Sequence, residues 1–489
     1  MSLIVKSGSS TVLTDTFDVT STSAGCTTNA SVTTCTEIFT LAPGSYTASV
    51  ATYDAANGSG NVLSEEQLAG FTVASGVANA IPLTLYGVPK TIAVSGNAPT
   101  VWGSQSGGFT VFGSVAQSLA ITAKDADGNT IVGPGLPTWN VTASSGSGFS
   151  IVQPASGANT FSLTPSGNVS ETFTVTASYS DASVCAQSDA DCATTFSASR
   201  EQTLVYCADN GEVYALAPPY TGTPSVIDTN MCDADYEKIA VDSYGIVFVA
   251  RNAAIDIIEP PYTSVTTLTT LTGSSYQGLA VDAAGDALLC GGGVPAADAY
   301  LFEISPPYTS VSKPGVQCST SNPQMVFTGS GVAIDYTSYV EEIASPYTSV
   351  EATATPGPSG GQQAIAADAT GDVAIVSNKL VEFPAGRFTS PVDVGAASSY
   401  SDVAFDHLGN LYASTDADVV EYEPPFSSSS SSVATMNFGG TNAERLVFDS
   451  GEDLFASGGT GIYELAPPYT GTPAQLVTTN AVYALGITP

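Results

Sequence analysis

The sequence contains little positive charge. Only 10 of its 489 residues are Lys or Arg, against 45 Asp and Glu, so the formal net charge is −35. Nucleic acids and anionic lipid surfaces are bound through clustered basic side chains that replace counterions. The composition therefore excludes nucleic acid as a partner. It also predicts that any ligand is neutral or cationic, because the acidic surface repels anions.

Long apolar runs are also missing. No stretch approaches the ~20 consecutive apolar residues that a membrane-spanning helix needs, so no transmembrane segment is predicted. The first six residues lack the basic and then apolar profile of a signal peptide. We therefore expect either a secreted chain whose signal segment has been removed or an intracellular protein, and the cysteines distinguish the two.

The eight cysteines fall into four local pairs: Cys26 with Cys35, Cys185 with Cys192, Cys207 with Cys232, and Cys290 with Cys318. An even count without redox or metal spacing favours disulfides in an oxidising compartment. The alternative is buried free thiols in a cytosolic protein. We predict the four local disulfides and an extracellular or cell-surface location.

Histidine is nearly absent, since His407 is the only one. No Cys-x-x-Cys spacing occurs, and one histidine cannot complete a Cys/His zinc set, so neither a metal site nor a cofactor is predicted. A Ser-His-Asp arrangement would depend on His407 alone, and no Gly-x-Ser-x-Gly elbow precedes a helix. Groups able to act as a general base near neutral pH are therefore scarce, and no catalytic residue is predicted.

What the chain does contain is a repeat. Gly, Ser, Thr and Val are abundant, as in strands and turns, and from residue 200 a Pro-Pro-Tyr-Thr phrase recurs in exact or degenerate form. The aromatic residues of its copies are Tyr220, Tyr262, Tyr308, Tyr347, Phe388, Phe426 and Tyr469. They are separated by 42, 46, 39, 41, 38 and 43 residues, a period that suits one four-stranded sheet per copy.

A second phrase precedes the first and consists of a short apolar run, an Asp and then a Gly. Ile239, Ala240, Val241 and Asp242, followed by Gly245, form one copy. Similar runs end at Asp282, Asp368, Asp406 and Asp449, whereas the run at residues 325–328 ends in Thr328. Each predicts an innermost strand followed by an Asx-type turn in which Gly takes a positive φ.

Only six such strands accompany the seven aromatic phrases, but residues 482–488 at the end of the chain match an innermost strand. We expect them to complete the first repeat and to remove an open sheet edge. Residues 1–198 lack the repeat and alternate apolar and polar residues in short runs. The predicted fold is all-β: two immunoglobulin-like β-sandwiches (1–88 and 89–198) and a seven-bladed β-propeller (199–489) closed by its C-terminal strand.

These motifs carry a family resemblance. Through the Ala-Val-Asp-x-x-Gly phrase, residues 199–489 resemble the seven-bladed propellers of the NHL-repeat and virginiamycin B lyase-like group. Residues 1–198 resemble bacterial immunoglobulin-like modules through the run at 42–46 and the turn at 125–129. The resemblance implies that lyases of this group use histidine and magnesium. This chain departs from it, because its single histidine lies in a turn that should face away from the channel mouth.

A propeller usually binds ligands at the mouth of its central channel, where the innermost strands begin. The polar residues expected at or near this mouth are Glu237, Lys238, Gln277, Gln324, Gln363, Asp402, Glu444 and Arg445. They form either a site for a sugar or peptide or the solvated rim of an empty channel. The seven repeated aromatics form either a stacking surface for glycans or the packing of each blade's turn, and their recurrence in every repeat favours packing.

Three classes of function follow. The first is a secreted or cell-surface, non-catalytic scaffold or adhesion protein that presents the propeller to a protein or neutral glycan. The second is a structural subunit that self-associates into a fibre or surface layer, through the strand around Leu3, Ile4 and Val5 or through sandwich edges. The third is a lyase or hydrolase of the virginiamycin B lyase-like kind. Fold alone does not distinguish them.

Overall fold

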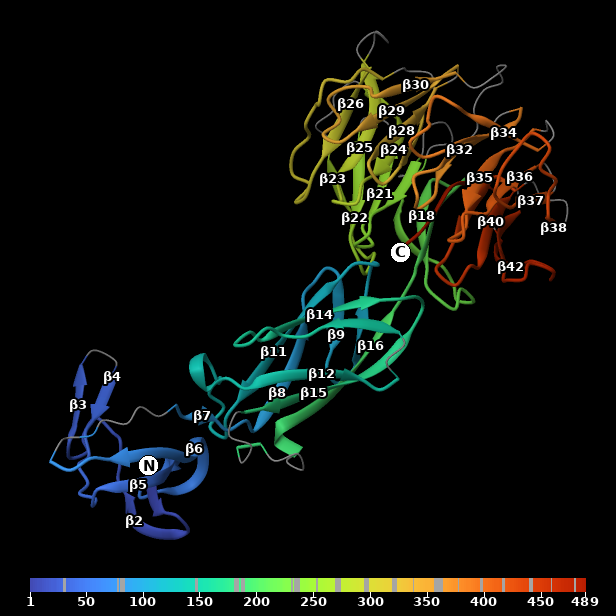
Figure 1. Cartoon of the computed structure of the whole chain (residues 1–489). Coiled ribbons are helices and arrows are strands. Elements are labelled where there is room, and N and C mark those ends of the chain that lie inside the picture. The colour runs from blue at the N-terminus through green and yellow to red at the C-terminus, as the bar shows by residue number, and fades with distance from the viewer. Residues whose placement is uncertain are drawn as a thin grey trace. The chain divides into compact units, whose positions relative to one another are not determined.

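The structure is a computed structural model of the chain (Figure 1). It describes residues 1–29, 32–76, 79, 84–145, 148–179, 184–185, 190–229, 232, 238–251, 254–268, 274–293, 299–318, 323–336, 338–355, 364–376, 378–395, 399–415, 418–438, 443–458, 460–478 and 481–489. These residues form strands β1 to β43 and two 3₁₀ turns, with no α-helix among them. In this described part of the chain, no helix has the length and hydropathy that crossing a membrane requires. The chain is all-β, as predicted.

The chain divides into two compact units. The first comprises Met1–Thr110, Ala116–Thr164 and Ser170–Ser199, and the second comprises Val111–Val115, Pro165–Val169 and Arg200–Pro489. The first unit contains both N-terminal modules. The second contains the repeats.

The N-terminal module has one main sheet in the order β2-β1-β5-β6-β7. Its strands are β1 (Ser2–Ser7), β2 (Ser10–Thr16), β5 (Gly44–Ala55), β6 (Ser59–Val73) and β7 (Tyr86–Gly87), and a separate hairpin comprises β3 (Cys26–Asn29) and β4 (Val32–Cys35). The predicted second sheet of a sandwich is not seen among the described residues of 1–88. The expected role of Leu3, Ile4 and Val5 in strand addition is also wrong, because β1 is paired on both sides and the edge strand next to it is β2.

The following module has two sheets, in the orders β12-β15-β16-β10-β9 and β13-β14-β11-β8. The strands are β8 (Thr91–Gly96), β9 (Val101–Ser104), β10 (Gly108–Val111), β11 (Gln117–Lys124), β12 (Thr138–Ala143), β13 (Phe149–Val152), β14 (Thr160–Pro165), β15 (Ser170–Ser178) and β16 (Ala193–Arg200). Alternate residues of β11 and β15 are buried, including Leu119, Ile121, Phe173 and Val175. This period of two is the pattern of strands with one face in a core.

The second unit consists of seven antiparallel sheets, numbered here 1 to 7 in chain order. Sheet 1 comprises β17 (Leu204–Ala208), β18 (Glu212–Leu216), β19 (Ser225–Thr229) and β43 (Val482–Ile487); sheet 2 comprises β20 (Lys238–Val241), β21 (Val247–Arg251), β22 (Ala254–Ile258) and β23 (Thr266–Leu268). Sheet 3 comprises β24 (Ser274–Val281), β25 (Ala287–Gly293) and β26 (Ala299–Ile304); sheet 4 comprises β27 (Gln324–Phe327), β28 (Gly331–Asp335), β29 (Val340–Ala344) and β30 (Ala352–Ala354). Sheet 5 comprises β31 (Ala364–Ala367), β32 (Val373–Val376), β33 (Leu380–Phe383) and β34 (Val392–Val394). Sheet 6 comprises β35 (Asp402–Phe405), β36 (Leu411–Ser414), β37 (Asp418–Tyr422) and β38 (Ala434–Asn437); sheet 7 comprises β39 (Arg445–Phe448), β40 (Leu454–Gly458), β41 (Gly461–Leu465) and β42 (Ala474–Thr478).

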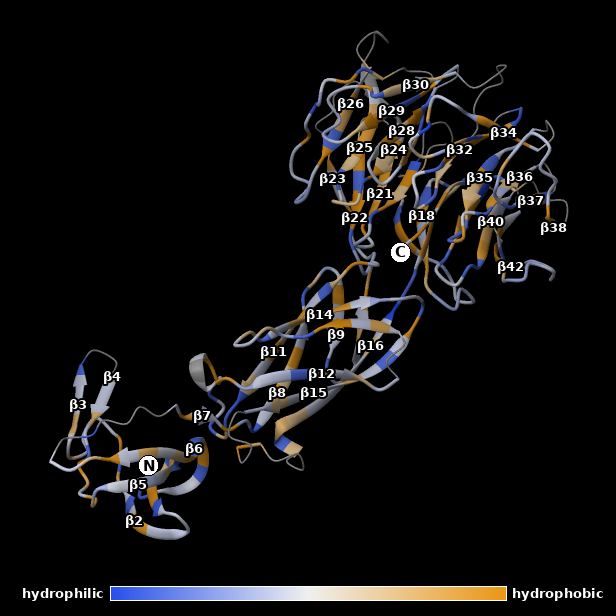
Figure 2. Cartoon of the chain, in the orientation of Figure 1, coloured by the Kyte–Doolittle hydropathy of each residue, from blue (hydrophilic) through white to orange (hydrophobic). Residues whose placement is uncertain are grey.

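The innermost strands contact one another in a cyclic order. The strands β20, β24, β27, β31, β35 and β39 each contact the next, and β43 contacts both β39 and β20. The expected pairing of the C-terminal strand is confirmed, since β43 lies antiparallel to β17 with Leu204 opposite Ile487. This is a propeller-like arrangement. Figure 2 shows that its strands, such as β22 with the sequence AIDII, are rich in hydrophobic residues.

The predicted Asx turns are present. In sheet 2 the Oδ1 atom of Asp242 accepts hydrogen bonds from the N–H groups of Tyr244 (2.9 Å) and Ile246 (2.7 Å), and Gly245 has φ +84°. The turn of sheet 7 differs from the prediction, because Glu452 rather than Gly451 takes the positive φ, at 67°. All four predicted disulfides are also confirmed: Cys26–Cys35, Cys185–Cys192, Cys207–Cys232 and Cys290–Cys318.

Candidate functional site

One end of the channel holds a small cavity of about 170 Å³. Every one of the seven innermost strands contributes at least one residue to its lining. Four of the residues predicted at the mouth lie there together: Lys238, Gln324, Asp402 and Arg445. Each of the four is the first residue of its innermost strand, so aligning these strands along the sequence was sufficient to group them.

The remaining predicted mouth residues are not all placed. Glu237 and Gln363 lie outside the described residues, and only the backbone of Gln277 is described, at a register shift within β24. Glu444 is half-buried and does not line the cavity. Its carbonyl oxygen instead accepts a 2.6 Å hydrogen bond from Nη1 of Arg445, so Glu444 helps to hold that guanidinium in place.

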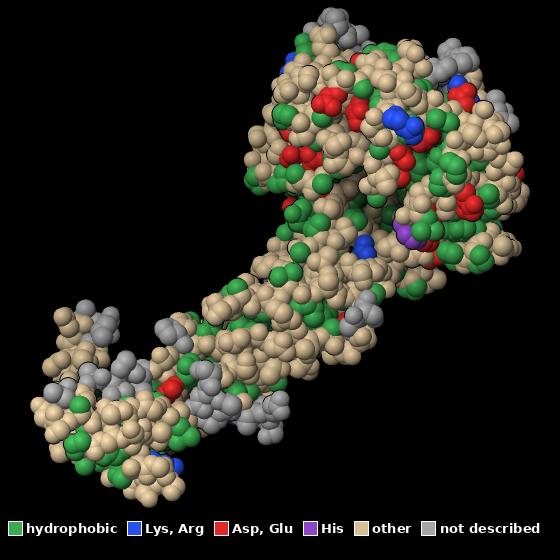
Figure 3. All heavy atoms as spheres, viewed as in Figure 1, with side chains coloured by type: hydrophobic (Ala, Val, Ile, Leu, Met, Phe, Trp, Pro, Cys, Tyr) green, Lys and Arg blue, Asp and Glu red, His purple; other side chains and the backbone are tan. Residues whose placement is uncertain are grey.

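The charges at this mouth differ from those of the whole chain. Asp402 is only 8% exposed, and burial raises its pKa to about 6, although Arg445, the Leu446 N–H and Lys238 lower it. Its Oδ2 accepts a 2.6 Å hydrogen bond from the Leu446 N–H, and Nε of Arg445 donates to the Tyr483 carbonyl (3.0 Å). Two cations thus lie beside one buried carboxylate. The mouth is a locally basic spot on a unit whose surface is rich in Asp and Glu (Figure 3).

The opposite end of the channel, where the innermost strands end, holds a larger cavity of about 600 Å³. His407 lines it and so lies away from the mouth, as the sequence predicted. Its Nδ1 pairs with Oε1 of Glu452, and its side chain is 63% exposed. Sequence analysis missed this cavity, because its polar residues come from turns whose Asp side chains were assigned a purely structural role.

Five of the seven repeated aromatics are buried. The Tyr262 hydroxyl donates to the Gly245 carbonyl (2.8 Å), and the Tyr469 hydroxyl donates to the Glu452 carbonyl (2.7 Å). Each hydroxyl therefore bonds to the turn between the first two strands of its own sheet. The buried members are Tyr220, Tyr262, Tyr308, Tyr347 and Phe388, while Phe426 and Tyr469 are half-buried. Buried rings cannot stack on a glycan, so the packing alternative holds for these five.

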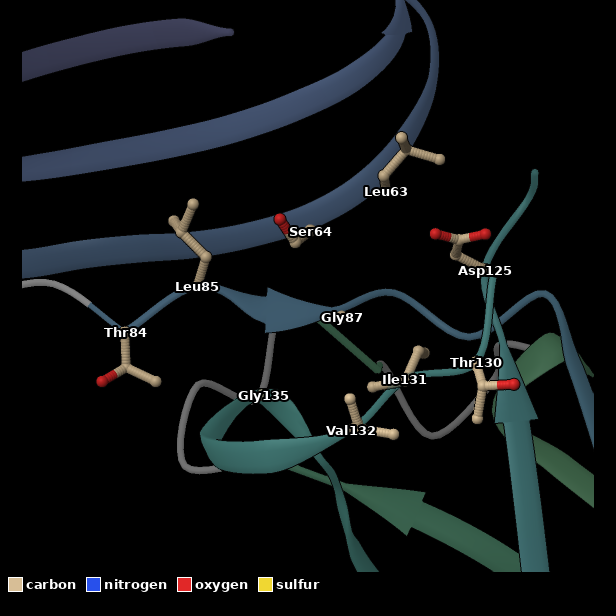
Figure 4. Close-up of a pocket in the computed structure, with 10 residues that line it drawn as sticks. All are labelled: Leu63, Ser64, Thr84, Leu85, Gly87, Asp125, Thr130, Ile131, Val132 and Gly135. Atoms are coloured by element: carbon tan, nitrogen blue, oxygen red, sulfur yellow. The ribbon is translucent and has the colours of Figure 1, made fainter. Parts of the chain in front are cut away.

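A third cavity, of about 520 Å³, lies within the first unit and is drawn in Figure 4. A Cβ added to Gly87 would lie 2.6 Å from Cγ2 of Ile131, so this glycine allows β7 to approach the loop closely. Asp125 is the only charged residue in its lining. The Oδ1 atom of Asp125 already accepts the N–H groups of Asp127 (3.0 Å) and Asn129 (2.9 Å), which confirms the predicted turn. This cavity brings no reactive groups together.

Across the ranges that the structure describes, no three His, Cys, Asp or Glu residues lie close enough together to hold a metal ion. No family model and no curated protein matches the chain. Solved structures do resemble it. A functionally unknown protein from Desulfotomaculum acetoxidans DSM 771 is 12% identical, with a TM-score of 0.47 over 58% of this chain and 98% of that chain.

Two further solved structures are similar. Virginiamycin B lyase from Staphylococcus aureus is 10% identical, with a TM-score of 0.43 over 53% of this chain and 96% of the lyase chain. A chain of a nidogen/laminin complex is 13% identical, with a TM-score of 0.37 over 48% of this chain and 93% of that chain. All three TM-scores are below 0.5, so the propeller-like assignment rests on the cyclic order of the seven innermost strands.

Proposed function

We propose that the protein is a secreted or cell-surface, non-catalytic scaffold that presents a seven-bladed, NHL-like propeller on its two N-terminal modules, the second of which, residues 89–198, is immunoglobulin-like. The cyclic contacts of the seven innermost strands support the blade number. The four disulfides support an oxidising, extracellular environment, where such bonds persist.

The observation that carries this proposal is the convergence of Lys238, Gln324, Asp402 and Arg445 in one cavity. Its volume of about 170 Å³ is below the roughly 300–1,000 Å³ of ordinary small-molecule pockets. It suits one inserted side chain better than a whole ligand. Since two cations line it, the inserted group is an acceptor such as a carboxylate or amide oxygen from a protein partner. Overall charge still opposes a strongly acidic partner or glycan.

Binding measurements on peptide and glycan arrays test this proposal, with uronic and sulfated sugars included. We expect binding to at least one array member to be lost in Lys238→Ala and Arg445→Ala. Lys379→Ala is the matched control, because Lys379 pairs with Asp393 (2.6 Å) and does not line the mouth. Equal binding by all three variants and the wild type contradicts a site at the mouth. Turnover of a substrate that Arg445→Ala abolishes would instead support the lyase or hydrolase alternative.

Self-association is a second candidate because one observation favours it. Strand β2 has a sheet partner only on its β1 side among the described residues, and its residues, such as Val12 (48% exposed), are mostly exposed. Such an edge is a template for adding a strand. Light scattering at rising protein concentration tests this, with Val12→Lys expected to reduce any assembly. A wild-type chain that stays monomeric rules the candidate out.

A further inference from the structure

The larger cavity, at the end of the channel opposite the mouth, has the volume and chemistry of a ligand pocket. At about 600 Å³ it falls within the range of roughly 300–1,000 Å³ typical of small-molecule sites. Phe405 and Phe448, the last residues of β35 and β39, line it and are half-buried. Each therefore offers part of its ring to the cavity.

The strongest sign of a ligand is Arg200, which lines the same cavity. Arg200 is only 7% exposed, and its Nη1 donates a 3.4 Å hydrogen bond to the Ser450 hydroxyl. Its Nε has no hydrogen-bond partner among the described residues. A buried donor without a partner costs free energy, so a charged N–H in this position calls for an acceptor.

The cavity also contains a carboxylate that its neighbours do not fully engage. In sheet 3 the equivalent carboxylate, that of Asp282, accepts a 2.7 Å hydrogen bond from Tyr347 of the next sheet. Beside Asp368 of sheet 5, the corresponding residue of the next sheet is Phe426, which has no hydroxyl. The Oδ2 of Asp368 accepts a hydrogen bond from the Thr370 hydroxyl (3.0 Å) and retains a free lone pair.

We propose that this cavity binds a neutral, hydroxylated ligand, namely a monosaccharide or the terminal sugar of a glycan. One hydroxyl of a sugar can accept from Arg200 and another can donate to Asp368, because every hydroxyl is both an acceptor and a donor. The C–H face of a sugar ring packs against Phe405 and Phe448. A free anion is repelled by Asp368 and Glu452, and a simple cation would leave the Nε of Arg200 unpaired. This site is separate from the proposed protein-binding mouth, and either can be present without the other.

The single histidine provides the test. Because His407 lines this cavity and is the only histidine of the chain, its imidazole signals in an NMR spectrum report on this end of the channel alone. We expect glucose, galactose, mannose or N-acetylglucosamine, titrated into the full chain, to shift these signals to saturation. Glucuronic acid should shift them less. No saturable shift with any of the four neutral sugars overturns the proposal.

Three variants locate the ligand. We expect Phe448→Ala and the near-isosteric Asp368→Asn each to weaken sugar binding by about tenfold, whereas Lys238→Ala at the mouth leaves it unchanged. Unweakened binding by Asp368→Asn overturns the proposal even where Phe448→Ala does not fold. Loss of the shift in Lys238→Ala overturns it too, since the sugar would then lie at the mouth. Methyl glycosides distinguish a free monosaccharide from the terminal sugar of a glycan. If they still bind, the site accepts a glycan terminus; if binding is lost, the ligand is a free sugar.

Discussion

Neighbouring sheets of the second unit are joined in two different ways. Between sheets 2 and 3, and between sheets 3 and 4, the hydroxyl of the repeated Tyr reaches the turn Asp of the preceding sheet. The distances are 3.4 Å from Tyr308 to Asp242 and 2.7 Å from Tyr347 to Asp282. Each bond joins the turn that contains the repeated Tyr to the Asx turn of the preceding sheet. Both bonds are buried, and a charged acceptor strengthens a hydrogen bond.

The interfaces between sheets 4 and 5 and between sheets 5 and 6 lack this bond. Thr328 replaces the Asp in sheet 4, and Phe388 replaces the Tyr in sheet 5 and packs with Val326 of sheet 4. Donor and acceptor are thus lost together, so no carboxylate is left buried without a partner. Phe426 of sheet 6 packs against the same apolar cluster as Ala366 of sheet 5, but Asp368 of sheet 5 remains. The difference teaches that the repeat tolerates the loss of its polar link where apolar packing replaces it, and that the carboxylate left over lines a cavity.

Deleting residues 481–489 is expected to have the largest effect, because it removes a whole intersheet contact. Strand β43 pairs with β17 and contacts β39 and β20, so both neighbouring interfaces lose a partner. We expect the second unit to lose more than about 4 kcal/mol of unfolding free energy. Thermal unfolding followed by circular dichroism measures this, with the transition of the first unit as internal control. An unchanged second transition contradicts closure by β43.

Asp335→Asn tests sheet 4, which has no polar link to sheet 5 and contains a buried carboxylate elsewhere. Neither oxygen of Asp335 has a partner in the described part of the chain, and burial raises its pKa to about 8. The folded state thus binds this proton more tightly than the unfolded state, so unfolding free energy rises as pH falls through about 8. We expect Asp335→Asn to stabilise the protein by roughly 2–4 kcal/mol above pH 8 and to flatten this pH dependence.

The control for that variant is Asp256→Asn. Asp256 is equally buried but forms an ion pair with Arg251 (2.5 Å), so its replacement should destabilise the protein on both sides of pH 8. Urea unfolding at a pH on either side of 8 measures both variants. A loss of stability in Asp335→Asn above pH 8 would mean that this carboxylate has a partner.

Tyr347→Phe breaks the stronger of the two polar links. It leaves the carboxylate of Asp282 without its 2.7 Å donor while keeping the ring, and we expect a loss of about 2 kcal/mol. Tyr308→Phe should cost about 1 kcal/mol, since its contacts with Asp242 and the Gly285 carbonyl are longer, at 3.4 and 3.2 Å. Guanidinium unfolding measures the loss of unfolding free energy in both variants. An equal loss, or a larger loss in Tyr308→Phe, would show that these hydrogen bonds do not determine the stability.

Phe426→Tyr is the smallest and sharpest test, because it restores the missing donor next to Asp368. We expect a gain of about 0.5–1 kcal/mol in unfolding free energy, again by guanidinium unfolding. Phe388→Tyr is the matched control: it adds the same hydroxyl where Thr328 replaces the carboxylate, and should not stabilise. A gain in the control but not in Phe426→Tyr would refute the equivalence of these positions.

Much of the second unit could be predicted from the sequence because its signals are local and repeat. A turn Asp caps its own backbone, so the strands ending at Asp242 and Asp406 were recognisable without any tertiary contact. Cysteines close in the chain could be paired for the same reason. The N-terminal module was predicted less well, since alternation marks a strand but not its partner, and β1 proved to be a central strand.

The sequence by itself determined where the strands and turns lie, how many inner strands there are, and which residues begin them. Only the tertiary structure decided the two ends of the channel. The raised pKa of Asp402, the unpaired Nε of Arg200 and the pairing of His407 with Glu452 all depend on side chains far apart in the sequence. Burial and cavity volume are set by how all seven inner strands converge, and no local pattern encodes that convergence.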